Sequence, residues 1–149
     1  MVSWGKMWYD LESAKYEGLA ESRQLLVEWL SSLEDETGVP LKRTILGGFS
    51  QGGAMSLDVG LTLPVAGIVS MSGFLHSKPQ PLAKKVPPVL MSHGRQDPVV
   101  PLEAAKRSRD SLTAAGVDVR YQEFDMGHEI RLEVLALVRT FIQEAMSNC

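Results

Sequence analysis

Short apolar runs alternate with longer amphipathic stretches along the chain, and no other feature limits its fold as strongly. Apolar runs typical of buried strands cover residues 44–49, 65–71 and 88–93, and residues 117–124 alternate between apolar and polar as a fourth strand would. Helical periodicity covers residues from 12 or 17 to 36, 54–60, 101–116 and the segment after 128, whereas the first ten residues are interpreted as a loop. Strands that alternate with helices predict an α/β fold, in which a mostly parallel sheet carries helices on both faces.

Two of the expected helices have a predicted core face. In the first, the leucines fall at helical spacing and adjacent apolar residues join them: Leu19, Leu26, Leu30 and Leu33, with Leu25 and Trp29. In the last, the face consists of Leu132, Leu135, Val138, Phe141 and Ile142. Because such a stripe must be buried against another element, we expect both helices to pack on the sheet or on each other.

The composition is that of one ordinary globular domain covering residues 1–149. Apolar residues make up 44% and charged residues 22% of the 149 residues, and the net charge is −3, so neither a disordered chain nor a nucleic-acid-binding protein is expected. The single cysteine, Cys149, excludes an internal disulfide and a cysteine-based metal site. No apolar run reaches the roughly 18 residues of a membrane span, and the first ten residues lack the apolar core of a signal peptide. A cytoplasmic protein is therefore expected.

Ligands of open parallel sheets bind beyond the carboxyl ends of the strands. The first strand is followed there by Gly48-Phe49-Ser50-Gln51-Gly52, a G-x-S-x-G motif between a strand and a helix. A serine on such a sharp turn is exposed as a nucleophile, and the flanking glycines are needed because the turn is crowded. The motif predicts Ser50 as nucleophile and the backbone N–H of Gln51 as an oxyanion donor.

A serine nucleophile needs a base and an acid, and both follow later strands. Asp97 comes after the third strand and His128 after the fourth, which is the chain order Ser, Asp, His of hydrolases with this fold. Asp125 remains the alternative acid, although it shares a short turn with His128. His93 is interpreted as supporting the end of its strand through a hydrogen bond.

Two further titratable residues are given no catalytic role. His76 is interpreted as a polar loop residue and Asp58 as a charge on a helix surface. The sequence contains no P-loop, no G-x-G-x-x-G and no metal-ligand constellation, so we expect neither cofactor nor metal.

Three of these segments together resemble one family. Residues 47–56 (GGFSQGGAMS), 92–101 (SHGRQDPVVP) and 127–130 (GHEI) are similar to the nucleophile, acid and histidine segments of the phospholipase/carboxylesterase family, which includes the acyl-protein thioesterases. Residues 8–11 (WYDL) resemble the start of the family's helical entry. The resemblance implies an α/β-hydrolase fold and a serine esterase or thioesterase. Its substrate would be a small-molecule or lipidated-protein acyl ester.

The resemblance also leads to expectations beyond the triad. Family members have further N-terminal strands and a His-Gly-rich loop that supplies a second oxyanion N–H; neither is found here, so the strand 44–49 is expected to have an open edge prone to self-association. The alternative function is therefore a weak or inactive remnant that acts by association. Phe74 and Leu75 are candidate substrate contacts, because the loop they open helps to cover an acyl chain in the family; packing at the base of the loop is the other interpretation.

Overall fold

The computed structural model describes residues 18–79 and 84–148. Its strands are β1 (Ile45–Phe49), β2 (Gly67–Met71), β3 (Val89–Gly94) and β4 (Val119–Phe124). Its helices are α1 (Leu19–Thr37), α2 (Gln51–Gly60), α3 (Leu102–Ala114) and α4 (Leu132–Ser147), with one short 3-10 turn, η1 (Leu41–Arg43). The order of strands and helices is the predicted one, although α2 begins directly after Ser50, three residues earlier than expected.

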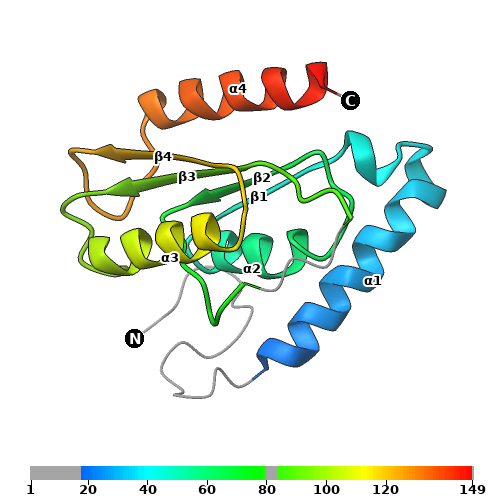
Figure 1. Cartoon of the computed structure of the whole chain (residues 1–149), viewed down its shortest axis with the longest axis horizontal. Helices are drawn as coiled ribbons and strands as arrows, with labels where there is room; N and C mark the ends of the chain where they lie inside the picture. The colour runs from blue at the N-terminus through cyan, green and yellow to red at the C-terminus, as the bar shows by residue number, and fades with distance from the viewer. Residues whose placement is uncertain (1–17, 80–83, 149) are drawn as a thin grey trace.

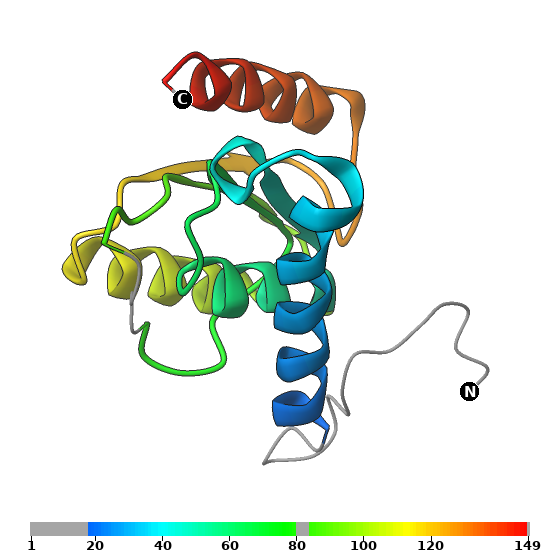
Figure 2. The ribbon, with the colours of Figure 1, turned by 90° about the vertical axis from the view of Figure 1, so that its right-hand side faces the viewer.

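The four strands form one parallel sheet in the order β1-β2-β3-β4. Helices α2 and α3 cover one face of the sheet and α4 covers the other, while α1 packs beside α2 (Figures 1 and 2). The predicted α/β fold is therefore confirmed. All four strands end at the same side of the sheet, so the segments that follow β1, β3 and β4 start close together.

Side chains from both faces of the sheet are buried, as expected for parallel strands covered by helices on both sides. Neighbouring residues of β2 illustrate this, because Ile68 belongs to the cluster beneath α2 and α3, and Val69 to the cluster beneath α4. Both are at most 2% exposed. Each such side chain contributes roughly 1.5–3 kcal/mol when it is removed from water, which fixes the strand ends in place.

The buried face of α1 is narrower than its sequence predicts. Leu26 and Leu30 are buried in one cluster with Met55 and Val59 of α2. Leu25 and Trp29, in contrast, are 65% and 56% exposed. The assignment of Leu25 and Trp29 to the core face was wrong, because successive helical residues are turned by about 100°. These two side chains form a separate row, and nothing in the described part of the chain covers it.

The core face of α4 is also displaced from the predicted one. Leu132 and Leu135 are 81% and 49% exposed, while Val134, Phe141 and Ala145 are buried. Val138 and Phe141 pack toward the sheet as predicted. The helix therefore docks through the row that starts at Val134, and the two exposed leucines lie at its N-terminal end.

The two edges of the sheet are formed by β1 and β4. Within the described residues, β1 pairs only with β2, and β4 pairs only with β3. Gly47, in the middle of β1, is exposed.

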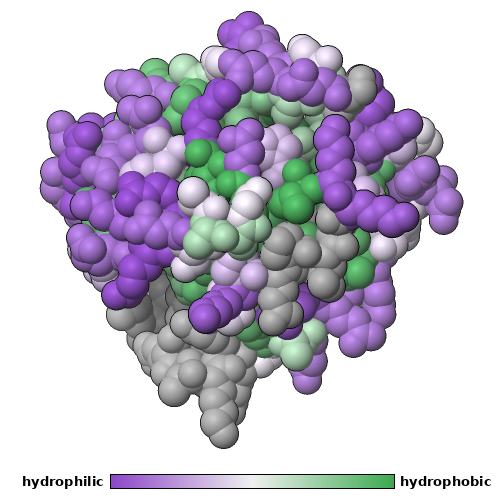
Figure 3. All heavy atoms as spheres, viewed as in Figure 1, coloured by the Kyte–Doolittle hydropathy of each residue, from purple (hydrophilic) through white to green (hydrophobic). Residues whose placement is uncertain are grey.

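On the face seen in Figure 3, polar side chains predominate and apolar ones are scattered between them. No helix within residues 18–79 and 84–148 combines the length and apolar character needed to cross a membrane.

Candidate active site

Ser50 lies on the turn that joins β1 to α2. Its backbone has φ 56° and ψ −117°, a conformation that costs a non-glycine residue on the order of 1–3 kcal/mol. A hydrogen bond of 2.8 Å from its N–H to the carbonyl of Met71 holds the turn against β2. A Cβ atom on Gly48 would overlap the backbone of Gly52, so the flanking glycines are required for close approach, as the motif predicted.

Asp97 lies in the loop between β3 and α3, and its side chain is fully buried. One carboxylate oxygen, Oδ1, accepts hydrogen bonds of 2.8 Å from the backbone N–H groups of Val99 and Val100. Burial by itself raises the pKa of Asp97, but the hydrogen bonds from His128, Val100 and Val99 together outweigh burial and lower it. Asp97 is therefore an ionised acceptor at neutral pH.

His128 follows β4 and joins the other two residues. Its Nδ1 lies 2.7 Å from Asp97 Oδ2, and its Nε2 lies 2.9 Å from Ser50 Oγ. Because an ionised carboxylate only accepts hydrogen bonds, Nδ1 carries the proton and Nε2 is left to accept from the serine hydroxyl. The ring of Phe49 lies against the imidazole, with 4.7 Å between the ring centroids.

The segments that carry Asp97 and His128 are bonded to each other through the backbone. Arg95 and Gln96 donate N–H hydrogen bonds of 2.9 and 3.0 Å to the carbonyls of Phe124 and Met126. A Cβ atom on Gly94, the last residue of β3, would overlap the backbone of Met126 and Gly127. The acid and the histidine are thus held in register by main-chain contacts.

The alternative acid, Asp125, does not take part in this arrangement. Its side chain is 80% exposed and accepts a hydrogen bond of 2.6 Å from Arg95. This ion pair lowers its pKa, first through the hydrogen bond and then through the charge of Arg95. Asp125 therefore pairs with Arg95 at the surface, whereas Nδ1 of His128 faces Asp97.

His93 is buried, and its Nε2 lies 2.7 Å from the carbonyl oxygen of Val100. This contact agrees with the interpretation that His93 supports the end of its strand. It also places the imidazole beside Asp97, with 3.6 Å between Nε2 and Oδ2.

His76 lies in the loop after β2 and Asp58 lies on α2, as interpreted from the sequence, but their side chains belong to one partly buried cluster. The side chain of His76 is only 2% exposed, and its Nδ1 lies 4.0 Å from Asp58 Oδ2. Asp58 accepts a hydrogen bond of 2.6 Å from Arg23 of α1. Burial lowers the pKa of His76. The negative charge of Asp58 partly offsets this lowering, and the positive charge of Arg23 lowers the pKa further. The cluster joins α1, α2 and the loop after β2.

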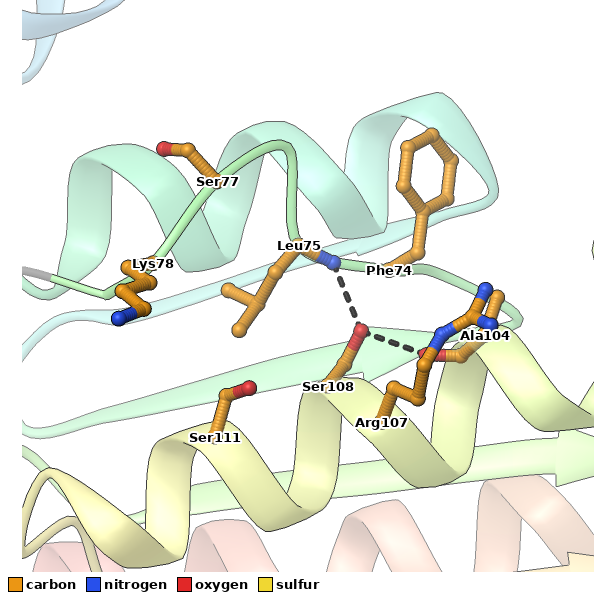
Figure 4. A pocket seen from close by; sticks show the side chains of 8 residues that line it. All are labelled: Phe74, Leu75, Ser77, Lys78, Ala104, Arg107, Ser108 and Ser111. Carbon is orange, nitrogen blue, oxygen red and sulfur yellow. Dashed lines mark hydrogen bonds between the residues drawn. The ribbon is translucent and has the colours of Figure 1, made fainter.

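Phe74 and Leu75 line a groove of about 350 Å³ between the loop after β2 and α3 (Figure 4). The N–H of Leu75 donates to Ser108 Oγ over 2.9 Å, and Ser108 Oγ donates to the carbonyl of Ala104 over 2.7 Å. Lys78 and Arg107 line the same groove. Leu75 also packs against the core cluster of the sheet, so it is both a groove residue and a packing residue.

Some residues of the site had no distinct signal in the sequence. Phe49 occupies the variable position before the serine, and only the structure shows its ring against His128. The amides of Val99 and Val100 lie two and three residues after Asp97, where an aspartate commonly bonds to its own loop. No group of three His, Cys, Asp or Glu side chains placed to hold a metal ion was found in residues 18–79 and 84–148.

A parallel sheet whose strand ends bring together a serine, a histidine and an aspartate defines the α/β-hydrolase class. The sequence profile of the phospholipase/carboxylesterase family matches residues 1–146. The chain therefore belongs to this family.

Individual relatives agree with this classification. Acyl-protein thioesterase 1 of Neurospora crassa is 34% identical over 97% of this chain, which spans 69% of that relative. Acyl-protein thioesterase 1 of Gibberella zeae is 39% identical over 76% of this chain, which spans 52%, or about half, of that relative. The crystal structure of esterase PE8 is 33% identical and superposes with a TM-score of 0.84, covering 95% of this chain and 71% of that one.

Proposed function

We propose that this protein is a serine hydrolase that cleaves carboxylic esters or thioesters through an acyl-enzyme. The observation that supports this is the continuous chain of hydrogen bonds from Asp97 through His128 to Ser50, with contacts of 2.7 and 2.9 Å. A nucleophile, its base and the group that orients the base are thus within reach of one another before any substrate binds. Ser50, His128 and Asp97 are the proposed catalytic residues.

In the proposed reaction, His128 Nε2 takes the proton of Ser50 while Oγ attacks the substrate carbonyl. The proton then passes from Nε2 to the departing alcohol or thiol as the bond to the leaving group breaks. A water molecule repeats the sequence on the acyl-serine, which releases the acid and restores Ser50. Asp97 stabilises the imidazolium that forms in each half and holds the ring in the correct tautomer.

The negative charge on the carbonyl oxygen needs donors at the start of α2. Gln51 is the first residue of that helix and directly follows Ser50. We assign its backbone N–H as one oxyanion donor, supported by the positive end of the helix dipole. One such donor is worth roughly 10²–10³ in rate.

For the substrate, we propose an acyl ester or thioester of a small molecule or of a lipidated protein. The relatives named acyl-protein thioesterase support the thioester class, and Phe74 and Leu75 offer apolar contacts in the groove between the loop after β2 and α3. A reducing, cytoplasmic location belongs to the same proposal, because the sequence has one cysteine.

The proposal is tested by covalent labelling with a fluorophosphonate probe, followed by mass spectrometry of the labelled peptide. We expect one label on Ser50, no label on Ser50→Ala and a fall of several orders of magnitude in ester hydrolysis by that variant. Ser56→Ala is the matched control, since Ser56 lies in α2 and its hydroxyl donates to the carbonyl of Gly52 within the same helix. A folded parent that takes up no label would contradict the proposal.

A second candidate function, association through the free edge of β1, is supported by a separate observation. In the described residues no strand pairs with the outer side of β1, and β1 contains no charged residue that would discourage pairing. We propose that a second copy of the chain pairs there.

A further inference from the structure

His93 is the next-to-last residue of β3, and its buried imidazole lies beside the carboxylate of Asp97. The residue is 1% exposed, and Nε2 lies 2.7 Å from the carbonyl oxygen of Val100. Because a carbonyl oxygen only accepts, the imidazole donates from Nε2, which fixes its tautomer.

Val100 connects this histidine to the acid. Its C=O accepts the hydrogen bond from His93, while its N–H donates to Asp97 Oδ1 over 2.8 Å. The same carboxylate presents its other oxygen, Oδ2, to His128. A shift of Val100 would therefore rotate the carboxylate and change the direction in which Oδ2 faces His128.

We propose that His93 is a positioning residue for the reaction: by holding Val100, it sets the orientation of the Asp97 carboxylate toward His128. The proposal rests on the serine hydrolase function above. It adds His93 as a fourth side chain to the hydrogen-bonded series formed by Asp97, His128 and Ser50. The backbone of Val100 joins His93 to Asp97.

The surroundings of His93 favour this role over simple packing. Its Nδ1 is buried and has no hydrogen-bond partner among residues 18–79 and 84–148, and an unpaired buried nitrogen lowers stability. An apolar side chain of similar size would avoid that loss. The histidine is thus better explained by the hydrogen bond from Nε2 than by stability alone. Among the described residues, Asp97 is the charged group recorded within ion-pair distance of it.

Three substitutions at position 93 separate positioning from packing. The amide nitrogen of His93→Gln reaches the place of Nε2, that of His93→Asn reaches only the place of Nδ1, and His93→Leu has no donor. We expect kcat to fall roughly 10–100-fold in His93→Asn and His93→Leu with little change in KM, since a misplacement of about 1 Å can cost on the order of 100-fold. His93→Gln should recover most of the parent's kcat.

A readout that needs no substrate is the proton on His128 Nδ1, which resonates far downfield in the NMR spectrum when it is bonded to a carboxylate. We expect this signal to persist in His93→Gln and to shift upfield or broaden in His93→Asn. Leu112→Val, a change in the fully buried core of α3, controls for lost stability and should leave the signal in place.

Two results would overturn the proposal: equal kcat in His93→Gln and His93→Asn, or an unchanged Nδ1 signal in His93→Asn. Failure of the serine hydrolase function itself would be distinguishable, because it would appear as a parent protein that is neither active nor labelled at Ser50.

Discussion

The two edge strands of the sheet, β1 and β4, both lead to a proposed catalytic residue but differ in the charged side chains they carry. Ser50 directly follows β1, and His128 comes four residues after the end of β4. β4 carries charged residues that reach neighbouring elements: Arg120 bonds to Glu144 of α4, and Glu123 to Arg95. β1 carries none, and its central residue, Gly47, is exposed.

This difference shows that the position of a proposed catalytic residue and the protection of its strand are separate properties. Charged side chains are a common protection of an edge strand against pairing with another chain, and β4 has them. β1 instead needs small residues, because its end must pass close to α2. Gly48 is needed for the serine turn, and together with Gly47 it leaves this part of the edge without side chains that would keep another strand away.

The largest expected effect concerns the carboxylates near the β4 end. Asp97→Asn should lower kcat/KM by about 10⁴-fold, because the amide favours the wrong tautomer of His128. Asp125→Asn should stay within a few-fold of the parent, since Asp125 bonds to Arg95 at the surface. Rates on a chromogenic short-chain ester test both variants, and a crippled Asp125→Asn beside a normal Asp97→Asn would reverse the assignment.

The same variant changes stability in acid. Because the folded protein lowers the pKa of Asp97, its ionised form stabilises the fold above the unfolded value of about 3.9, and this contribution is lost as the pH falls through the lower, folded value. Asp97→Asn should therefore lose less stability than the parent as the pH falls from 5 to about 3. Thermal unfolding at several pH values measures the difference.

The next effect compares two adjacent glycines of β1. Gly48→Ala should destabilise the fold by about 1–3 kcal/mol and lower activity on the order of 100-fold, because the new Cβ overlaps the backbone of Gly52. Gly47→Ala adds a Cβ at 3.2 Å from that of Val69, which a small shift relieves. Its activity should remain close to that of the parent. Similar losses in both variants would show that the turn does not depend on the missing side chain.

A charge on β1 should make its edge resemble that of β4. Gly47→Lys is expected to reduce self-association several-fold relative to Gly47→Ala, which has the same added Cβ without the charge. Gln122→Lys adds a lysine to the exposed edge of β4 and should change nothing. Light scattering over a range of concentrations gives the masses, and a parent that stays monomeric throughout would rule out association through β1.

The smallest effect is expected at the ion pair between β4 and α4. Glu144→Gln removes the charge that pairs with Arg120 at the protein surface. Such pairs are worth less than about 1 kcal/mol and are screened by salt. Denaturant unfolding at low and high salt should show a difference only at low salt. A loss well above 1 kcal/mol would mean that this pair, and not the buried face of α4, holds the helix to the edge.

The first three strands were predictable because their apolar runs are nearly continuous, β4 because apolar and polar residues alternate in it, and the helices because their periodicity is clear. The faces of α1 and α4 were harder to predict. Apolar residues occupy more than one row of each helix, and the sequence does not indicate which row meets a partner. Trp29 and Leu132 were placed in the core for their hydrophobicity, yet both are exposed.

At the site, the motif and the chain order predicted Ser50, Asp97 and His128 as catalytic residues. The structure places His128 within hydrogen-bond distance of both Asp97 and Ser50. The burial of His76 beside Asp58 could not be predicted, because it depends on how α1 and the loop after β2 meet α2. The contact between Phe49 and His128 likewise joins opposite edges of the sheet, and no local pattern records it.

The hydrogen bonds of the site also have a consequence for the order of folding. Asp97 and His128 are 31 positions apart, whereas Ser50 and His128 are 78 apart. Contacts between residues far apart in the sequence form slowly. We therefore expect β3, α3 and β4 to bring Asp97 and His128 together first. Ser50 would join them only after β1 and β2 have docked. Labelling of Ser50 during refolding would therefore count only those molecules in which all four strands have assembled.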